Sequence, residues 1–452
     1  MKTADGGPPS PPSSVEEASS AADANAIAAG SGGSSPKKGI DALSERQKGL
    51  LVLLTVPFAW GSFEPATRYL YAIDPPVPAL VFSLSYYLVA ATALLSAAAI
   101  GSAAPSPSRG GGGGDEKGDS EAWPVAGGLE LGTYLFVGNA LQVFGLKTVE
   151  SDKAAFLLQL TTIFVPLAEA ALVSFSPSSS RQKGRGNNSN AFLQAVSLRT
   201  WVACLIALAG VAAMSLEGAG GGGLQGLGGG GGGGGNGVGF LAGLPSVLSE
   251  SLAQWSTGDT YIVAAAVAYT FHCIRLEKYA KSTSAVKLAA SKASTETALS
   301  LLSVAGVVLY YYSSHSAPSG GDQEAAGTNF ALDMGREIVS YGESLSRGLS
   351  SGSIRASVLA PALASVLWTG LVTCAYTIYA QSYGQGRVRP VTANLIYTVQ
   401  PICTAILAWL VLGESLGPAG YVGGALIGSA VLLVIGESPS ASEDASTEQT
   451  VI

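Results

Sequence analysis

The stretch from Arg389 to Glu414 constrains the fold of this chain more than any other, and it reads RPVTANLIYTVQPICTAILAWLVLGE. It carries no charge between Pro390 and Gly413. At about 1.5 Å per residue, such a run predicts one helix that crosses a bilayer. Asn394, Tyr397, Pro401 and Thr404 recur at steps of three and four and share one helical face, which makes a polar stripe with a proline in mid-helix. A polar face of this kind is costly against lipid, so we expect it to face other helices or a wet cavity inside a bundle.

The composition extends this prediction to the whole chain. Only 12% of its 452 residues are charged and 48% are hydrophobic, whereas about 25% of the residues in typical soluble domains are charged. Uncharged apolar runs near membrane-spanning length recur along the sequence. The chain is therefore predicted to be an all-α polytopic membrane protein. Its four cysteines lie in apolar runs without metal-like spacing, which predicts small packing residues, and they are Cys204, Cys273, Cys374 and Cys403.

We expect about ten transmembrane helices in this chain. They fall at about residues 49–71, 77–102, 123–146, 154–175, 201–216, 260–271 with an extension toward 279, 297–312, 358–383, 389–414 and 421–435.

The segments outside these spans have simpler expectations. Residues 1–47 and 437–452 are predicted to be disordered tails, and residues 217–258 a flexible glycine-rich linker. A long connector follows at about 314–355, in which Phe330 to Leu349 places apolar residues at three- and four-residue steps. This segment is either an amphipathic helix on the membrane surface or a disordered loop.

The distribution of Lys and Arg among the connectors predicts the orientation of the chain. A cytosolic N-terminus places most connector Lys and Arg residues inside, and Lys292 is counted among them. Both termini are then cytosolic. The plasma membrane and an organelle envelope are equally compatible with this pattern.

The chain also resembles itself across its midpoint. Two sets of residues share identical spacing, Gln142, Phe144, Gly145, Val149 and Ala154 in the first half and Gln381, Tyr383, Gly384, Val388 and Ala393 in the second. The halves cover residues 48–216 and 259–436, with five predicted spans each. An odd number of spans requires the second half to enter the membrane upside down. Inverted repeats of this kind are typical of transporters that alternate between inward-open and outward-open states.

Two motifs point to a known family. Ala59 to Ser62 reads AWGS, and Ala393 to Glu414 ends in a proline-containing helix followed by Leu-Gly-Glu. With the five-plus-five duplication, these resemble the EamA family of the drug/metabolite transporter superfamily. The resemblance implies a ten-helix transporter with a central cavity that moves small organic metabolites such as amino acids. The first repeat departs from the pattern, because Pro166 lies one turn later than Pro401 would predict and no Leu-Gly-Glu follows.

The candidate solute-binding residues are polar or aromatic side chains within the predicted spans. They are Trp60, Asn139, Gln142, Gln159, Tyr269, Tyr376, Asn394, Tyr397 and Gln400. They are interpreted as walls of a cavity between the two halves. The alternative is that these side chains hold helices together, a common use of Thr, Asn and Gln in membranes.

Three titratable residues are candidates for proton coupling. Glu130 and Glu169 lie deep in apolar runs, where carboxylates are costly and usually functional or paired. His272 titrates near neutral pH when unperturbed. The alternatives are that each carboxylate reaches water near a helix end and that His272 is a satisfied interface residue.

Together these patterns predict a secondary transporter that moves a small organic metabolite by alternating access. No ATP site, metal cluster or catalytic triad is visible in the sequence, so energy is expected from a gradient of protons or of the solute. The expected partners are the solute and the lipid bilayer, without a cofactor or nucleic acid, and a homodimer is compatible. Two alternatives stay open. One is a membrane enzyme of lipid chemistry, although only His272 and His315 exist as histidines, and the other is a non-transporting receptor or scaffold.

Overall fold

The computed structural model describes residues 43–63, 70, 76–103, 122–146, 148–149, 154, 157–175, 197–218, 255–316, 330–352, 356–412 and 417–436. The predictions for both tails and for the glycine-rich linker therefore fall almost entirely outside the described residues. Glu45–Ile452 form one compact unit, and all contacts below lie within it. The described residues contain helices and turns but no strand, which confirms the all-α class.

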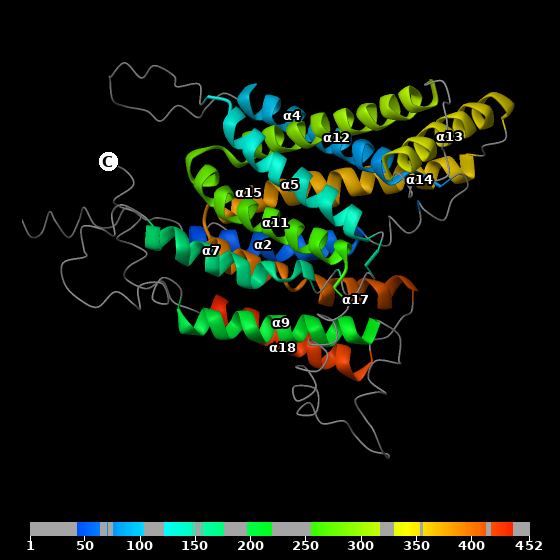
Figure 1. Cartoon of the computed structure of the whole chain (residues 1–452). Coiled ribbons are helices and arrows are strands. Elements are labelled where there is room, and N and C mark those ends of the chain that lie inside the picture. Colours follow the sequence, from blue (N-terminus) through cyan, green and yellow to red (C-terminus); the bar gives the residue numbers. More distant parts are fainter. Residues whose placement is uncertain are drawn as a thin grey trace, which may run out of the picture. The chain divides into compact units, whose positions relative to one another are not determined.

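Helices follow one another along the whole described chain (Figure 1). In the first half they are α2 (Glu45–Gly61), α4 (Ala79–Ala103), α5 (Val125–Leu146), α7 (Thr161–Phe175) and α9 (Leu198–Gly218). In the second half they are α11 (Thr257–Ser282), α12 (Ala285–Ser316), α13 (Phe330–Ser351), α14 (Ala356–Trp368), the π-helix η4 (Thr369–Tyr376), α15 (Thr377–Gln385), α16 (Pro390–Tyr397), α17 (Gln400–Leu412) and α18 (Pro418–Ile435).

Several of these helices have the length and composition of membrane spans. Among the described residues, four segments are long and apolar enough to cross a bilayer, and they are Ala79–Gly101, Ala285–Ser314, Leu359–Gln385 and Pro390–Leu407. Shorter apolar helices occur at Thr161–Leu172, Leu198–Ala213 and Gly420–Ile435. The chain is thus a multi-pass membrane protein. The count of ten spans and the inverted relation of the two halves stay predictions.

The helix predicted for residues 389–414 is broken in the middle. α16 ends at Tyr397 and α17 begins at Gln400. In the turn between them, the N–H of Thr398 lies 3.3 Å from the carbonyl oxygen of Asn394 and 3.2 Å from that of Leu395. Pro401 has no N–H to donate to Tyr397, and its ring would clash with that carbonyl in a regular helix. The prediction of one uninterrupted helix was therefore wrong, although the segment remains long enough to span.

The predicted start of the seventh span was also wrong. α12 begins at Ala285, three turns before the predicted start near residue 297. Its first turns carry Leu288, Ala289 and Ala293, which are fully buried against neighbouring helices. Lys292 lies among them and is itself buried. Its assignment to a cytosolic connector is therefore incorrect, because an alanine-rich helix carries it into the bundle.

The connector segment at residues 330–349 is helical. It forms α13, which packs along α12 (Figure 1). Gly335 lies so close to α12 that an added Cβ would be 2.6 Å from Cβ of Tyr311. Of the two interpretations, the helix is confirmed, and its position at a membrane surface remains a prediction.

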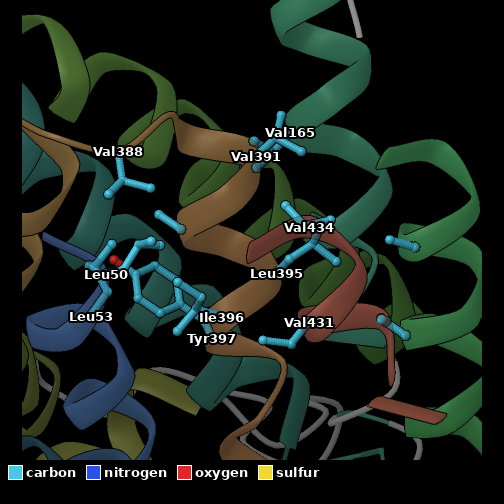
Figure 2. Close-up of a cluster of buried hydrophobic side chains, with 14 of the residues drawn as sticks. Leu50, Leu53, Val165, Val388, Val391, Leu395, Ile396, Tyr397, Val431 and Val434 are labelled. Carbon is cyan, nitrogen blue, oxygen red and sulfur yellow. The ribbon is translucent and has the colours of Figure 1, made fainter. Parts of the chain in front are cut away.

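A cluster of buried apolar side chains joins helices of both halves (Figure 2). Leu395 and Ile396 of α16 are nearly inaccessible at its centre. Around them lie Leu50 and Leu53 of α2, Val165 of α7, Val388 and Val391 at the start of α16, and Val431 and Val434 of α18. All four cysteines are buried and free. This confirms their prediction as packing residues, and Cys204 and Cys273 belong to this cluster.

Helices α9 and α18 make the closest pair in this part of the bundle and run side by side in Figure 1. Their contact is a close approach of backbones at Gly210, beside Gly423 and Ile427. Small residues at such positions let helices in a membrane come near enough for van der Waals packing.

Adding a methyl group at Gly210 is expected to destabilise this helix pair. A Cβ there would lie 2.7 Å from the carbonyl oxygen of Gly423 and 2.8 Å from Cγ1 of Ile427. Overpacking costs about 1–3 kcal/mol, so Gly210→Ala should lower the midpoint of thermal unfolding in detergent. Gly428→Ala on α18 is the control, because nothing lies within 4 Å of its added Cβ. Equal midpoints for the two variants would contradict the close packing.

Candidate functional site

A chain of hydrogen bonds links three helices in the bundle interior. The hydroxyl oxygen of Tyr269 on α11 lies 2.7 Å from Oδ1 of Asn139 and 2.9 Å from Oε1 of Gln142, both on α5. Its single proton can be donated to either oxygen. Nδ2 of Asn139 donates in turn to the hydroxyl of Tyr87 on α4. Three predicted solute-binding residues thus lie together, and Tyr87 joins them although the sequence did not single it out.

The glycine at position 138 explains how this contact forms. A Cβ on Gly138 would lie 2.5 Å from Cε1 of Tyr269, so only glycine lets the ring lie flat against α5. The hydroxyl of Tyr269 thereby reaches the side chains of Asn139 and Gln142. The hydrogen-bonded group therefore depends on a close approach of α5 and α11.

A second group of predicted residues surrounds Tyr397 on α16. The ring of Trp60 meets the ring of Tyr397 edge-on, with centroids 5.2 Å apart. Nε2 of Gln385 donates to the Tyr397 hydroxyl over 3.0 Å. Tyr397 is buried, and its ring belongs to the apolar cluster of Figure 2. These contacts join α2, α15 and α16.

The other predicted solute-binding residues make no side-chain hydrogen bond to these two groups among the described residues. Tyr376 is exposed on the π-helix, with its hydroxyl oxygen 2.5 Å from Oγ1 of Thr55. Gln159 and Gln400 are half-buried. Asn394 is buried, and its Nδ2 has no hydrogen-bond partner among the described residues.

Several buried polar atoms share this lack of a partner within the described part of the chain. They are Nε2 of His272, Nζ of Lys292, Oε2 of Glu296, Oε1 of Gln385 and Nδ2 of Asn394. A buried polar group left without a hydrogen bond costs about 1–3 kcal/mol. Native structures retain few of them, and each one calls for a structural or functional explanation. These five atoms lie on α11, α12, α15 and α16, and other such atoms lie on α7 and α9 of the first half, among them Oε2 of Glu169 and Nε1 of Trp201.

Lys292 and Glu296 were missed by the sequence analysis. A lysine near the end of a predicted span was counted as a solvated connector charge. The helical period held the missing signal, because Leu288, Lys292, Glu296 and Ser300 recur at steps of four. All four are buried in the structure.

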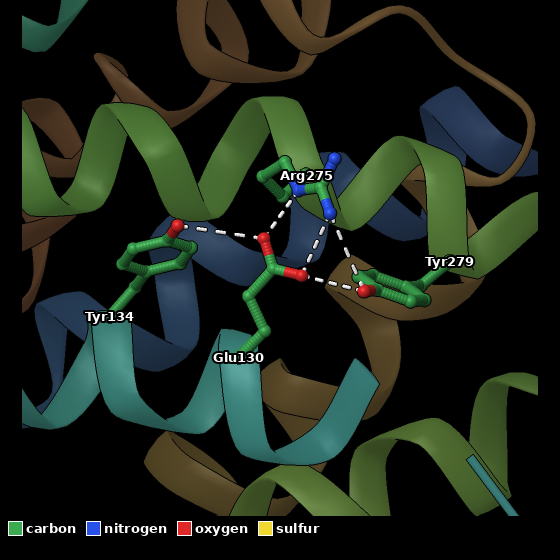
Figure 3. Close-up of polar contacts among 4 residues, drawn as sticks. All are labelled: Glu130, Tyr134, Arg275 and Tyr279. Atoms are coloured by element: carbon green, nitrogen blue, oxygen red, sulfur yellow. Dashed lines mark hydrogen bonds and ion pairs between the residues drawn. The ribbon is translucent and has the colours of Figure 1, made fainter. Parts of the chain in front are cut away.

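Glu130 is held by an arginine rather than left as a free carboxylate (Figure 3). Arg275 on α11 reaches both oxygens of Glu130 on α5, with Nη2 2.8 Å from Oε2 and Nε bonded to Oε1. The hydroxyl of Tyr279 donates to Oε2 over 2.6 Å, and that of Tyr134 lies 3.5 Å from Oε1. This two-pronged contact is the strongest arrangement available to a carboxylate and a guanidinium.

Two further ion pairs join the halves at the same end of the bundle. Arg389, which precedes α16, donates through Nε to Glu169 of α7 over 3.0 Å. Arg387 donates through Nε to Glu45 of α2 over 2.7 Å. The hydrogen bond from Lys48, and then that from Arg387, lowers the pKa of Glu45 to about 2. Glu45 precedes the first predicted span and stays ionised at neutral pH.

Glycine contacts place the pairs of Glu130 and Glu45 at one end of the bundle, and Arg389 follows Arg387 by two residues. An added Cβ at Gly127, beside Glu130, would lie 2.8 Å from the ring of Tyr279. One at Gly386, beside Arg387, would lie 3.0 Å from the carbonyl oxygen of Ala280. In each pair the first half supplies the carboxylate and the second half the arginine. The two halves are thus tied at this end by complementary charges.

His272, the third proton-coupling candidate, lies deep in the bundle. It is 2% exposed on α11, and Lys292 acts on it electrostatically. It does not belong to the ion pairs that hold Glu130 and Glu169. The structure therefore separates the three candidates into two paired carboxylates at one end and one histidine in the interior.

Removing the Tyr269 hydroxyl is expected to weaken the link between α5 and α11. Tyr269→Phe leaves Asn139 and Gln142 without their shared donor, which should cost about 0.6–1.5 kcal/mol and lower the unfolding midpoint in detergent. Tyr261→Phe on the same helix is the control, because Tyr261 is exposed. Should both variants unfold like the unmodified chain, the hydrogen-bonded group would not contribute to stability.

The sequence profile of the EamA-like transporter family matches residues 349–436, from the end of α13 through α18. The permease-like protein YdzE of Bacillus subtilis (strain 168) is 32% identical over 71 residues, which are 16% of this chain and 91% of that protein. One solved crystal structure of a protein aligns with 86% of this chain and 96% of its own, at 15% identity and a TM-score of 0.48. The family profile and the near-complete coverage of YdzE agree with the apolar helices of the bundle. The chain is a membrane transporter that belongs to the EamA-like transporter family.

Proposed function

We propose that this transporter moves a small organic metabolite, an amino acid or a similar solute, by alternating access. The two moving parts are residues 48–216 and 259–436, each with five spans and the second inverted. The observation that carries the proposal is the polar interior where α4 and α5 of the first half meet α11 of the second. There Asn139, Gln142 and Tyr269 form a hydrogen-bonded group inside an apolar bundle. Such groups are costly in a membrane and are retained mainly where a solute or ion passes.

The ion pairs at one end of the bundle support the alternating part of the proposal. A carrier must close one side while the other is open, and the closure must be reversible. Pairs of Glu130 with Arg275 and Glu169 with Arg389 join the halves by side chains alone. They can separate without unfolding a helix. With both termini in the cytosol, as the charge distribution predicts, this end is the cytosolic gate.

Proton coupling fits the same gate. Protonation of Glu130 or Glu169 removes the charge that holds its arginine, so an imposed proton gradient would favour opening of this end. His272 lies on α11 midway between Tyr269 and Arg275 and is buried. The proposal therefore assigns coupling first to the two paired carboxylates.

Transport is tested with the purified full chain in liposomes. We expect saturable uptake of at least one labelled solute from a panel of amino acids, purines and small organic acids. Asn139→Ala and Asn394→Ala should reduce the uptake about tenfold, because each removes a polar group worth about 1.4 kcal/mol in binding. Ser429→Ala, on the exposed face of α18, should leave it unchanged. Folded protein with no flux across the panel would favour the receptor or scaffold interpretation.

The gate is tested by exchanging charges across it. Glu169→Arg or Arg389→Glu alone places two like charges together and should slow uptake at least tenfold. The double exchange restores opposite charges and should recover most of the rate. The pair of Asp333 and Arg336 lies within α13, so exchanging it serves as the control and should have no effect. Single exchanges that transport normally would remove the gate from the mechanism.

A further inference from the structure

A pair of opposite charges lies in the interior of α12, and the function proposed above gives it no role. Lys292 and Glu296 are 0% and 1% exposed. They are one helical turn apart, so their side chains lie on the same face of the helix. Burying even one charge among apolar helices is costly, and such residues in membrane proteins usually mark a functional site.

The packing of α12 keeps both side chains away from water. The helix lies against α4, α5 and α15, and the neighbouring Ala289 and Ala293 are fully buried. Gly132 of α5 comes so near that an added Cβ would be 2.8 Å from the carbonyl oxygen of Lys292. A lysine at a helix end can extend its ammonium to the membrane surface. Lys292 is enclosed instead.

The surroundings of the pair connect it to the polar interior already described. Ala293, next to Lys292 in the chain, packs in the same buried apolar cluster as Tyr87 of α4 and Cys374 of η4. The Thr297 hydroxyl, next to Glu296, donates to the carbonyl oxygen of Tyr87 over 3.0 Å. The two charges therefore adjoin the hydrogen-bonded group of Asn139 and Tyr269.

The two side chains attract each other but do not complete each other's hydrogen bonds. Nζ of Lys292 and Oε2 of Glu296 both lack a partner among the described residues. An ammonium has three protons to donate and a carboxylate about four positions to accept them. A buried ion pair that only stabilises a fold needs good geometry and further hydrogen bonds around it. This pair lacks them and retains unused donors and acceptors.

We propose that Lys292 and Glu296 form the charge-recognition site for the transported solute and that this solute is a zwitterion such as an α-amino acid. The assignment rests on the transport function proposed above. The Lys292 ammonium binds the carboxylate of the solute, and the Glu296 carboxylate binds its ammonium. Both protein charges then have partners, and the filled site stays electrically neutral. The bundle encloses the pair in this structure, so the solute reaches it when one end opens.

The same arrangement predicts which solutes are rejected. A solute with only a carboxylate pairs with Lys292 but leaves Glu296 without a cation and near a second negative charge. A solute with only an ammonium pairs with Glu296 but leaves Lys292 without an anion and near a second positive charge. A site built for two polar groups discriminates strongly against analogues that lack one, because a buried group is then left unpaired. Tyr86 and Tyr87, whose ring centroids are 4.5 Å apart, lie on α4, which packs against α12.

Competition on the unmodified chain in liposomes tests the charge requirement without any substitution. The probes are alanine, leucine and phenylalanine, each with its methyl ester and its N-acetyl derivative. The ester lacks the carboxylate, and the N-acetyl derivative lacks the ammonium. We expect at least one free amino acid to be taken up, and both of its derivatives to compete at least tenfold more weakly. Equal competition by a derivative would overturn the proposal.

Substitution of the pair tests the residues themselves. Lys292→Met combined with Glu296→Gln removes both charges with little change in volume, and such replacements usually leave a fold as stable as before. The double variant should keep its unfolding midpoint but lose at least tenfold in amino acid uptake. Lys278→Met, on the exposed end of α11, is the matched control and should transport normally.

The outcomes separate this proposal from the transport function. Uptake of an amino acid that survives the double substitution would leave the transport function standing and overturn the recognition site. Selective uptake of neutral solutes or single anions by the unmodified chain would do the same. Folded protein without any flux would remove both. A charge exchange, Lys292→Glu with Glu296→Lys, should retain more uptake than either single change, since it keeps one group of each sign.

Discussion

Close contact between helix backbones is the constraint on which the rest of this structure depends. In a bilayer, lipid is as apolar as the helices, so no hydrophobic force brings two spans together, and small residues must allow packing at short range. α5 carries several glycines that permit such close contact. Added Cβ atoms at Gly128 and Gly132 would collide with Ser291 and Thr295 of α12, and one at Gly138 would collide with Tyr269 of α11. One helix of the first half is thus held between two helices of the second.

That contact decides which polar groups meet. Through its glycines, α5 contacts α11 on one side, where Asn139 meets Tyr269. On another side it contacts α12, where Gly132 lies against the backbone of Lys292. Polar side chains are then enclosed by neighbouring helices, where water does not compete for their hydrogen bonds and each unpaired group is costly. The result is an interior in which some groups are fully paired and others are not. The paired groups join neighbouring helices, and in the proposed mechanism the unpaired ones bind the solute.

The sequence predicted the helical class, because long apolar runs are stable in a bilayer only as helices or closed barrels, and runs of this length form helices. It also singled out Asn139, Gln142 and Tyr269 because they are polar within such runs; the structure joins them by hydrogen bonds, and their role in solute binding stays a prediction. It failed where three-dimensional neighbours decide. Lys292 has the sequence context of a solvated charge, but it is buried because α12 packs against α4 and α5. The partnership of Glu130 with Arg275 joins residues 145 positions apart, and no local pattern connects them. The break after Tyr397 follows from Pro401, but a proline alone does not reveal whether a helix bends or ends.

Rigid helices connect the charged end of the bundle to its polar interior. On α11, Arg275 at the gate and Tyr269 at the hydrogen-bonded group are six residues apart, about 9 Å along the axis. Arg389 caps the N-terminus of α16, five residues before Asn394 in that helix. A helix does not change its length, so a tilt that separates Arg275 from Glu130 must also move Tyr269 against Asn139. The same holds for Arg389 and Asn394. In the proposed mechanism, the gate and the solute site therefore cannot change independently, because α11 and α16 each carry one part of both.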